Sequence, residues 1–86
     1  MMLTQEEVQK HLYGLFDKVT ESIPDKDGLM RANLDYLINL YYGTTRWPYM
    51  QAEVERFLEK RDLVGLGLYL FKHISKYKES IGSRGI

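Results

Sequence analysis

The sequence predicts an all-α protein, a compact bundle of about four amphipathic helices joined by short loops. Three observations predict this fold. Apolar residues recur at steps of three and four in four segments, helix-capping residues precede several of these segments, and turn-forming residues separate them. With 86 residues, of which 44% are hydrophobic, the chain is expected to form a single domain over residues 1–86. The helices are predicted at about residues 4–22, 28–42, 46–60 and 62–80, followed by a frayed C-terminal tail.

The first segment, residues 4–22, has the most regular pattern. Thr4 and Glu7 have the spacing of a capping box, in which each side chain bonds the free backbone amide of the other. The turn-forming run Pro24-Asp25-Lys26-Asp27-Gly28 then ends the helix. The apolar stripe comprises Val8, Leu12, Leu15, Phe16, Val19 and Ile23.

The second segment, residues 28–42, has an unusually wide apolar surface, which is typical of a central or partner-covered helix. Asp25 or Asp27 is expected to cap its start, and Gly43 is expected to close its last turn in the left-handed conformation. Its apolar stripe comprises Met30, Leu34, Leu37, Ile38 and Tyr41, widened by Leu29, Tyr36, Leu40 and Tyr42. Its polar face comprises Arg31, Asp35 and Asn39.

The third segment, residues 46–60, contains Pro48 in its first turn, where the missing amide hydrogen costs nothing. Its apolar face comprises Met50, Val54, Phe57 and Leu58. Glu53 and Arg56 are three residues apart on the other face, a spacing that favours an ion pair.

The fourth segment, residues 62–80, begins at a capping residue, Asp62, and has two adjacent apolar stripes. Gly65 and Gly67 leave a short buried strand over residues 63–71 as an alternative. We favour the helix, because a lone strand would bury unpaired backbone groups and glycine lets another helix approach closely. The first stripe comprises Leu63, Leu66, Leu70, Ile74, Tyr77 and Ile81, and the second comprises Val64, Leu68 and Phe71.

Composition and motifs argue against an enzyme. The chain has no cysteine, which excludes disulfides, thiol nucleophiles and thiolate zinc sites. Asp25 opens a sequence like that of a calcium loop, but Met30 and Tyr36 occupy its glycine and glutamate positions. His11 and His73 lack metal-motif spacing, although Glu7 lies one turn before His11. We therefore predict no catalytic residue, metal, cofactor or small-molecule substrate.

Aromatic residues cluster where the second and third helices meet. Tyrosine, tryptophan and arginine are enriched at binding hot spots, which makes this corner a candidate partner surface. The alternative is that the rings plug one end of the bundle. The candidate binding residues are Tyr36, Tyr41, Tyr42, Arg46, Trp47 and Tyr49.

Charge is balanced overall but uneven along the chain. Residues 1–62 hold 8 basic and 11 acidic residues, a net charge of −3, whereas residues 63–86 hold 4 basic and 1 acidic, a net charge of +3. A basic patch of Lys72, His73, Lys76 and Lys78 either complements the helix C-terminus or meets a phosphate or an acidic partner.

The prediction for function is a small non-enzymatic module that binds another protein or a second copy of itself. A homodimer would cover the excess apolar surface of the second and fourth helices. The alternatives are a small DNA-binding regulator, suggested by the Gly43-Thr44-Thr45 turn but disfavoured by the acidic third helix, and an accessory subunit of a larger assembly. The N-terminus has no secretory pattern and the longest apolar run, residues 63–71, is far below the roughly 20 residues of a membrane span, so we expect a cytoplasmic protein.

Overall fold

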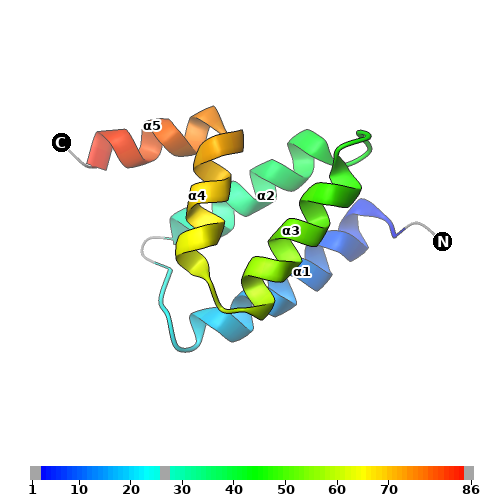
Figure 1. Cartoon of the computed structure of the whole chain (residues 1–86), viewed down its shortest axis with the longest axis horizontal. Coiled ribbons are helices and arrows are strands. Elements are labelled where there is room, and N and C mark those ends of the chain that lie inside the picture. Colours follow the sequence, from blue (N-terminus) through cyan, green and yellow to red (C-terminus); the bar gives the residue numbers. More distant parts are fainter. Residues whose placement is uncertain (1–2, 26–27, 85–86) are drawn as a thin grey trace.

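The chain folds into α-helices, with no strand among the residues that the structure describes. The computed structural model describes the backbone of residues 3–25 and 28–84, and the side chains in these ranges up to Glu79. The predicted all-α fold is confirmed, and residues 63–71, for which a strand was the alternative, are helical. The helices are α1 (Gln5–Thr20), α2 (Leu29–Tyr41), α3 (Trp47–Glu59), α4 (Leu63–His73) and α5 (Ser75–Arg84) (Figure 1).

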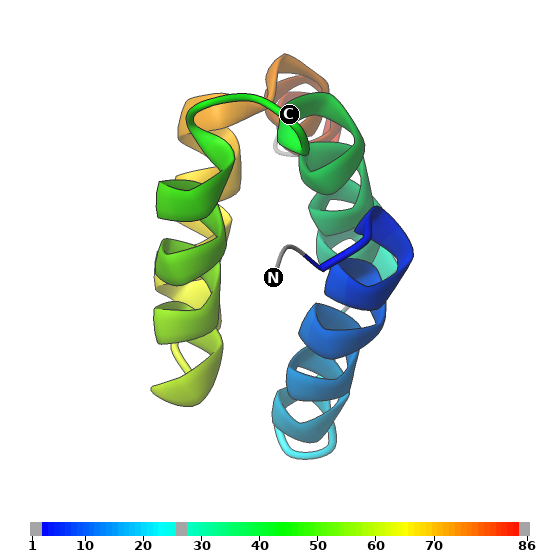
Figure 2. The ribbon, with the colours of Figure 1, turned by 90° about the vertical axis from the view of Figure 1, so that its right-hand side faces the viewer.

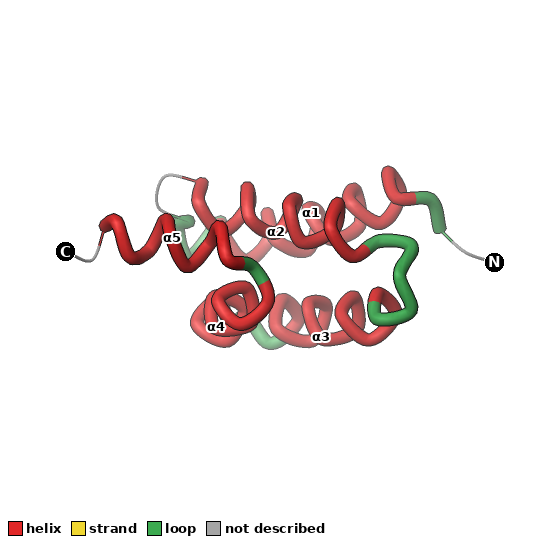
Figure 3. The backbone as a smooth tube through the Cα atoms, turned by 90° about the horizontal axis from the view of Figure 1, so that it is seen from above, coloured by secondary structure: helices red, strands yellow, loops and turns green. Residues whose placement is uncertain are grey.

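The first four helices form two layers. Helices α1 and α2 lie side by side in one layer, and α3 and α4 lie side by side in the other (Figure 2). Between the layers α1 packs against α3 and α2 packs against α4, so the four helices surround one apolar interior. Helix α5 contacts α4 and extends away from the bundle at the level of the α1–α2 layer (Figure 3).

The buried core uses most of the apolar stripe residues of the sequence, but the second stripe of α4 is exposed and the side chain of Ile81 lies outside the described range. Ile23 is an exception, because α1 ends at Thr20 and leaves Ile23 exposed in the following loop, outside the stripe in which it was predicted. The buried apolar residues are Val8, Leu12, Phe16 and Val19 of α1, Leu34, Leu37 and Ile38 of α2, Trp47, Met50, Val54 and Leu58 of α3, Leu63, Leu66 and Leu70 of α4, and Ile74 and Tyr77.

Local capping interactions fix several helix ends as predicted. The Thr4 hydroxyl accepts a hydrogen bond from the Glu7 amide and the Glu7 carboxylate accepts one from the Thr4 amide, both at 3.1 Å. The Asp62 carboxylate accepts a hydrogen bond from the Gly65 amide at 2.8 Å and so caps α4. Gly43, after α2, has a φ of 87°, in the left-handed region where glycine is favoured.

The start of α2 is capped from the preceding loop. The two carboxylate oxygens of Asp25 accept hydrogen bonds from the amides of Met30, at 3.1 Å, and Arg31, at 3.0 Å. Of the two predicted capping residues, Asp25 therefore has this role, and Asp27 lies outside the described residues. The negative carboxylate also complements the positive end of the helix dipole.

Replacing Asp25 with alanine should lower the free energy of unfolding by about 0.5–2 kcal/mol, the usual cost of removing a helix cap. Urea denaturation followed by circular dichroism measures the change. Asp25→Asn is the matched control, because it keeps one acceptor oxygen and should recover part of the loss. Equal stability of Asp25→Ala and the wild type would contradict this role for Asp25.

The polar face of α2 lies along α1. Three side-chain pairs join the two helices in antiparallel order, and this accounts for the spacing of four between the polar residues of α2. The pairs are Gln5 with Asn39, Gln9 with Asp35 at 2.9 Å, and Asp17 with Arg31 at 2.9 Å.

The fourth predicted helix, residues 62–80, is interrupted. Ile74 has an extended backbone, with φ −127° and ψ 111°, and separates α4 from α5. In a continuous helix Gly67 and Tyr77 would be about 15 Å apart along the axis. The break instead brings the Tyr77 hydroxyl to 3.3 Å from where a Cβ of Gly67 would lie. Both Ile74 and Tyr77 are buried in this arrangement.

The chain end also differs from the prediction. Helix α5 extends through Arg84, so residues 82–84 of the predicted frayed tail are helical. A helix can pass through Gly82 because one glycine costs only about 1 kcal/mol relative to alanine. Gly85 and Ile86 lie outside the described residues.

Candidate functional site

Some of the aromatic residues at the α2–α3 corner pack against the bundle and close one end of it. Trp47 is only 5% exposed, and its ring packs edge-on against Tyr42 at a centroid distance of 6.3 Å. The Tyr42 hydroxyl donates a hydrogen bond to the carbonyl of Leu3, which ties the N-terminal segment to this corner. Tyr42 and Trp47 also line a hollow of about 460 Å³ together with Leu3 and Pro48. The Trp47 Nε1 is buried, with no hydrogen-bond partner in the described part of the chain.

The remaining candidate residues of the corner lie in different surroundings. The Tyr41 hydroxyl donates a hydrogen bond to the His73 carbonyl at 3.3 Å, which joins α2 to the end of α4. The Tyr36 ring lies 5.4 Å from the Nζ of Lys76. Arg46 and Tyr49 are exposed, Tyr49 to 77%. Tyr41, Tyr42 and Trp47 therefore hold the fold together, whereas the other three present surface.

The four residues of the basic patch differ in burial and in charge. Lys72, Lys76 and Lys78 are exposed, but His73 is partly buried between the rings of Tyr41 and Tyr69. Burial lowers the pKa of His73, and the positive charges of Lys72 and Arg46 lower it further. Since the ordinary histidine pKa is about 6.5, the imidazole is neutral at pH 7 and the lysines carry the charge.

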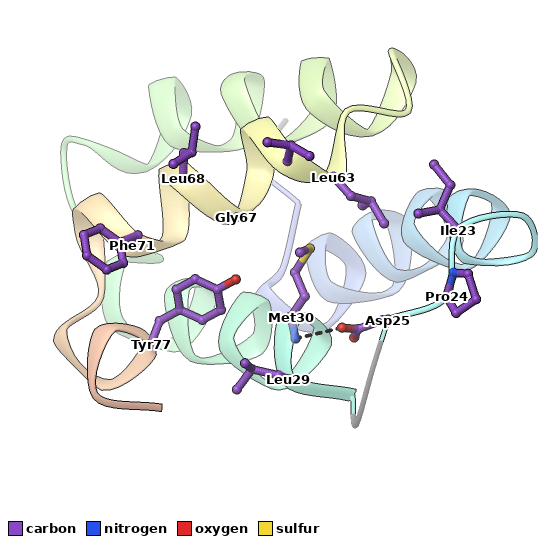
Figure 4. A pocket seen from close by; sticks show the side chains of 11 residues that line it. Ile23, Pro24, Asp25, Leu29, Met30, Leu63, Gly67, Leu68, Phe71 and Tyr77 are labelled. Carbon is purple, nitrogen blue, oxygen red and sulfur yellow. Dashed lines mark hydrogen bonds between the residues drawn. The ribbon is translucent and has the colours of Figure 1, made fainter. Parts of the chain in front are cut away.

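An exposed apolar surface lies along α4. Val64, Leu68 and Phe71 are 77%, 67% and 44% exposed, and Ile23 of the α1–α2 loop is exposed beside them. They border an open groove of about 630 Å³ (Figure 4), which we call the α4 groove. Its α4 wall consists of Leu63, Val64, Gly67, Leu68 and Phe71, and its other wall consists of Ile23, Pro24, Asp25, Leu29, Met30 and Tyr77.

Side chains of α2 and α5 pack closely beneath Gly67 in the groove. A Cβ on Gly67 would lie 3.3 Å from the Tyr77 hydroxyl and 3.6 Å from the Met30 Cε, so α2, α4 and α5 meet closely at this glycine. Burial raises the pKa of Tyr77, and the negative charge of Asp25 raises it further, so its hydroxyl stays protonated at neutral pH. The groove is therefore an apolar surface with few polar groups.

Candidate catalytic and metal-ligating groups are dispersed. Among residues 3–25 and 28–79, no three histidine, aspartate or glutamate side chains come close enough to hold a metal ion. The His11 Nε2 lies 3.5 Å from a carboxylate oxygen of Glu55 on α3, whereas Glu7, the acidic residue one turn before it in the sequence, accepts a hydrogen bond from the Thr4 amide. The predicted Glu53–Arg56 ion pair is present at 3.2 Å.

The sequence contained part of the signal for the α4 groove. The second stripe of Val64, Leu68 and Phe71 was visible, together with the inference that a partner copy would cover the excess apolar surface of the second and fourth helices. The opposite wall was not predictable in the same way, because Ile23 and Leu29 were assigned to apolar helix surfaces. Only the folded chain places the α1–α2 loop beside α4.

The fold and the groove define a small helical protein with an open apolar groove on one helix. Comparison with models of known protein families, with curated proteins and with solved structures finds no match to this chain. In the ranges that the structure describes, no helix is both long and apolar enough to cross a membrane.

Proposed function

We propose that this chain is a protein-binding module that holds an amphipathic helix of another protein in the α4 groove. The observation that carries the proposal is the contiguous exposed stripe of Val64, Leu68 and Phe71. Single exposed apolar residues are normal, but a contiguous apolar patch on a small protein is typical of an interaction site.

The shape of the groove favours a helix as its occupant. From Val64 to Phe71 the exposed stripe extends for seven residues, which is about 10 Å or two helical turns. An amphipathic helix presents apolar residues at the same spacing and binds such grooves through three or four anchors. A small-molecule site would need convergent polar groups, whereas both oxygens of Asp25 already accept hydrogen bonds from the start of α2.

A double variant of the stripe tests the proposal. Val64→Asp with Leu68→Asp places charges in the groove, and Tyr49→Asp is the matched control, because Tyr49 is as exposed as Val64 but lies on α3 outside the groove. All three proteins should fold, since substitutions at exposed positions usually change the free energy of unfolding by only about 0.5 kcal/mol. Circular dichroism and urea denaturation check this.

Affinity capture from a lysate of the source organism, with identification by mass spectrometry, supplies the candidate partner. We expect a protein retained by the wild type and by Tyr49→Asp but not by the double variant. Its helical segment, synthesised as a peptide, should bind the double variant at least about tenfold more weakly, a loss of about 1.4 kcal/mol. Equal binding to all three proteins would contradict the proposal.

Two further outcomes would assign the groove differently. A wild-type dimer in analytical ultracentrifugation that becomes monomeric in the double variant would make a second copy the occupant. Salt-sensitive binding of duplex DNA would support the regulator alternative instead. We expect no DNA binding, because exposed and half-buried residues of α3 include Glu53, Glu55 and Glu59, which would repel phosphates.

A further inference from the structure

We infer that the helix held in the α4 groove carries acidic residues at the end of its apolar face that lies next to Phe71. This inference rests on the proposed function and specifies the chemistry of the partner. It follows from the charged groups that lie at the Phe71 end of the groove.

Lysines surround the Phe71 end of the groove. The Nζ of Lys78 lies 5.4 Å from the centre of the Phe71 ring, and Lys72 follows Phe71 directly and is exposed. Between Leu63 and Lys78 the sequence contains three lysines and no acidic residue. An occupant that reaches past Phe71 therefore meets positive charge.

The Ile23 end of the groove has charges of both signs. The guanidinium of Arg61 donates a hydrogen bond to the Ser22 hydroxyl at 3.0 Å, next to Ile23 in the chain. The Asp25 carboxylate lines the groove, and Asp62 caps the start of α4. This end therefore favours neither an acidic nor a basic partner.

The lysines disfavour a parallel pairing of two copies of this chain through α4. Such a pairing would bring Lys72 and Lys78 of one copy against the same residues of the other. Positive charge would then face positive charge, whereas complementary charges are what guide specific association.

Three synthetic helical peptides test the inference against the full chain. Each is about five turns long, roughly 18 residues, with the same leucine stripe. They differ only in the residues that flank the stripe, which are glutamate, glutamine or lysine. Fluorescence anisotropy at about 20 mM salt should show the strongest binding for the glutamate peptide, weaker binding for the glutamine peptide and the weakest for the lysine peptide. The Kd values should span at least about tenfold. The span should shrink at about 0.5 M salt, where exposed charges are screened.

Variants of the protein test which residues cause the preference for the glutamate peptide. Lys78→Glu should reduce the preference for the glutamate peptide severalfold, because Lys78 lies over the Phe71 ring at the end of the groove. Lys10→Glu is the control for net charge, because Lys10 lies on α1 outside the groove, and it should leave the preference intact.

The outcomes separate the two proposals. Equal affinities for the three peptides, or a preference for lysine, would overturn the acidic partner but leave helix binding standing, provided that Leu68→Asp abolishes the binding. Failure of all three peptides to bind would overturn the proposed function itself. A preference for glutamate that Lys78→Glu does not change would place the charge recognition elsewhere and overturn this inference.

Discussion

Leu70→Ala should lower the free energy of unfolding by about 2–5 kcal/mol, the range for truncating a fully buried leucine. Leu70 is 0% exposed in α4, the helix that contacts α2, α3 and α5, so its loss leaves a cavity that several elements share. In a domain of this size each 1 kcal/mol shifts the Tm by about 4–8 °C. Thermal and urea denaturation followed by circular dichroism therefore show the change clearly.

Leu68→Ala is the matched control for this prediction. The same substitution two residues earlier removes a side chain that is 67% exposed, so the stability should change by no more than about 0.5 kcal/mol. The pair tests the orientation of α4 on which the α4 groove depends. Similar destabilisation by both variants would mean that Leu68 is covered by the chain itself.

Gly65→Ala should destabilise the protein by about 1–3 kcal/mol, through a lost cap and local overpacking. In most helices the same change is favourable by about 1 kcal/mol. Here a Cβ would overlap the Asp62 carboxylate that caps α4, and it would lie 2.8 Å from Cδ1 of Phe57. Both groups would have to move, and the cap hydrogen bond to residue 65 would be disturbed.

Gly14→Ala provides the comparison within the same chain. Gly14 lies in the middle of α1, is exposed, and has no atom within 4 Å of an added Cβ. Alanine should therefore raise the stability by about 0.5–1 kcal/mol. Urea denaturation of both variants should give changes of opposite sign. A stabilising Gly65→Ala would show that the contacts among Asp62, Phe57 and residue 65 are looser than the structure indicates.

Caps and core stripes were predictable because they depend on residues close together in the chain. The Thr4–Glu7 box and the Asp62 cap each join residues three apart. Their hydrogen bonds do not depend on which other helices pack nearby. The steps of three and four from Val8 to Val19 likewise define one buried face of a helix. The helices and most of the core follow from such patterns.

The candidate site was only partly predictable. The aromatic corner was identified from composition, but composition does not distinguish Trp47, which is buried, from Tyr49, which is exposed two residues later. The second stripe on α4 was recognised as surplus apolar surface, yet its role as a groove wall depends on Ile23 and Leu29, which come from other elements. These distinctions arise from packing between distant segments.

By itself the sequence determined that this chain is helical, where most of its helices begin and end, and which faces are apolar, since these properties arise within a few turns of backbone. Only the tertiary structure decided that the chain bends at Ile74, so that Tyr77 reaches Gly67, and that Val64, Leu68 and Phe71 stay uncovered. The reason is physical: each apolar face competes for a limited interior, and the packing of all the helices together determines which faces are buried.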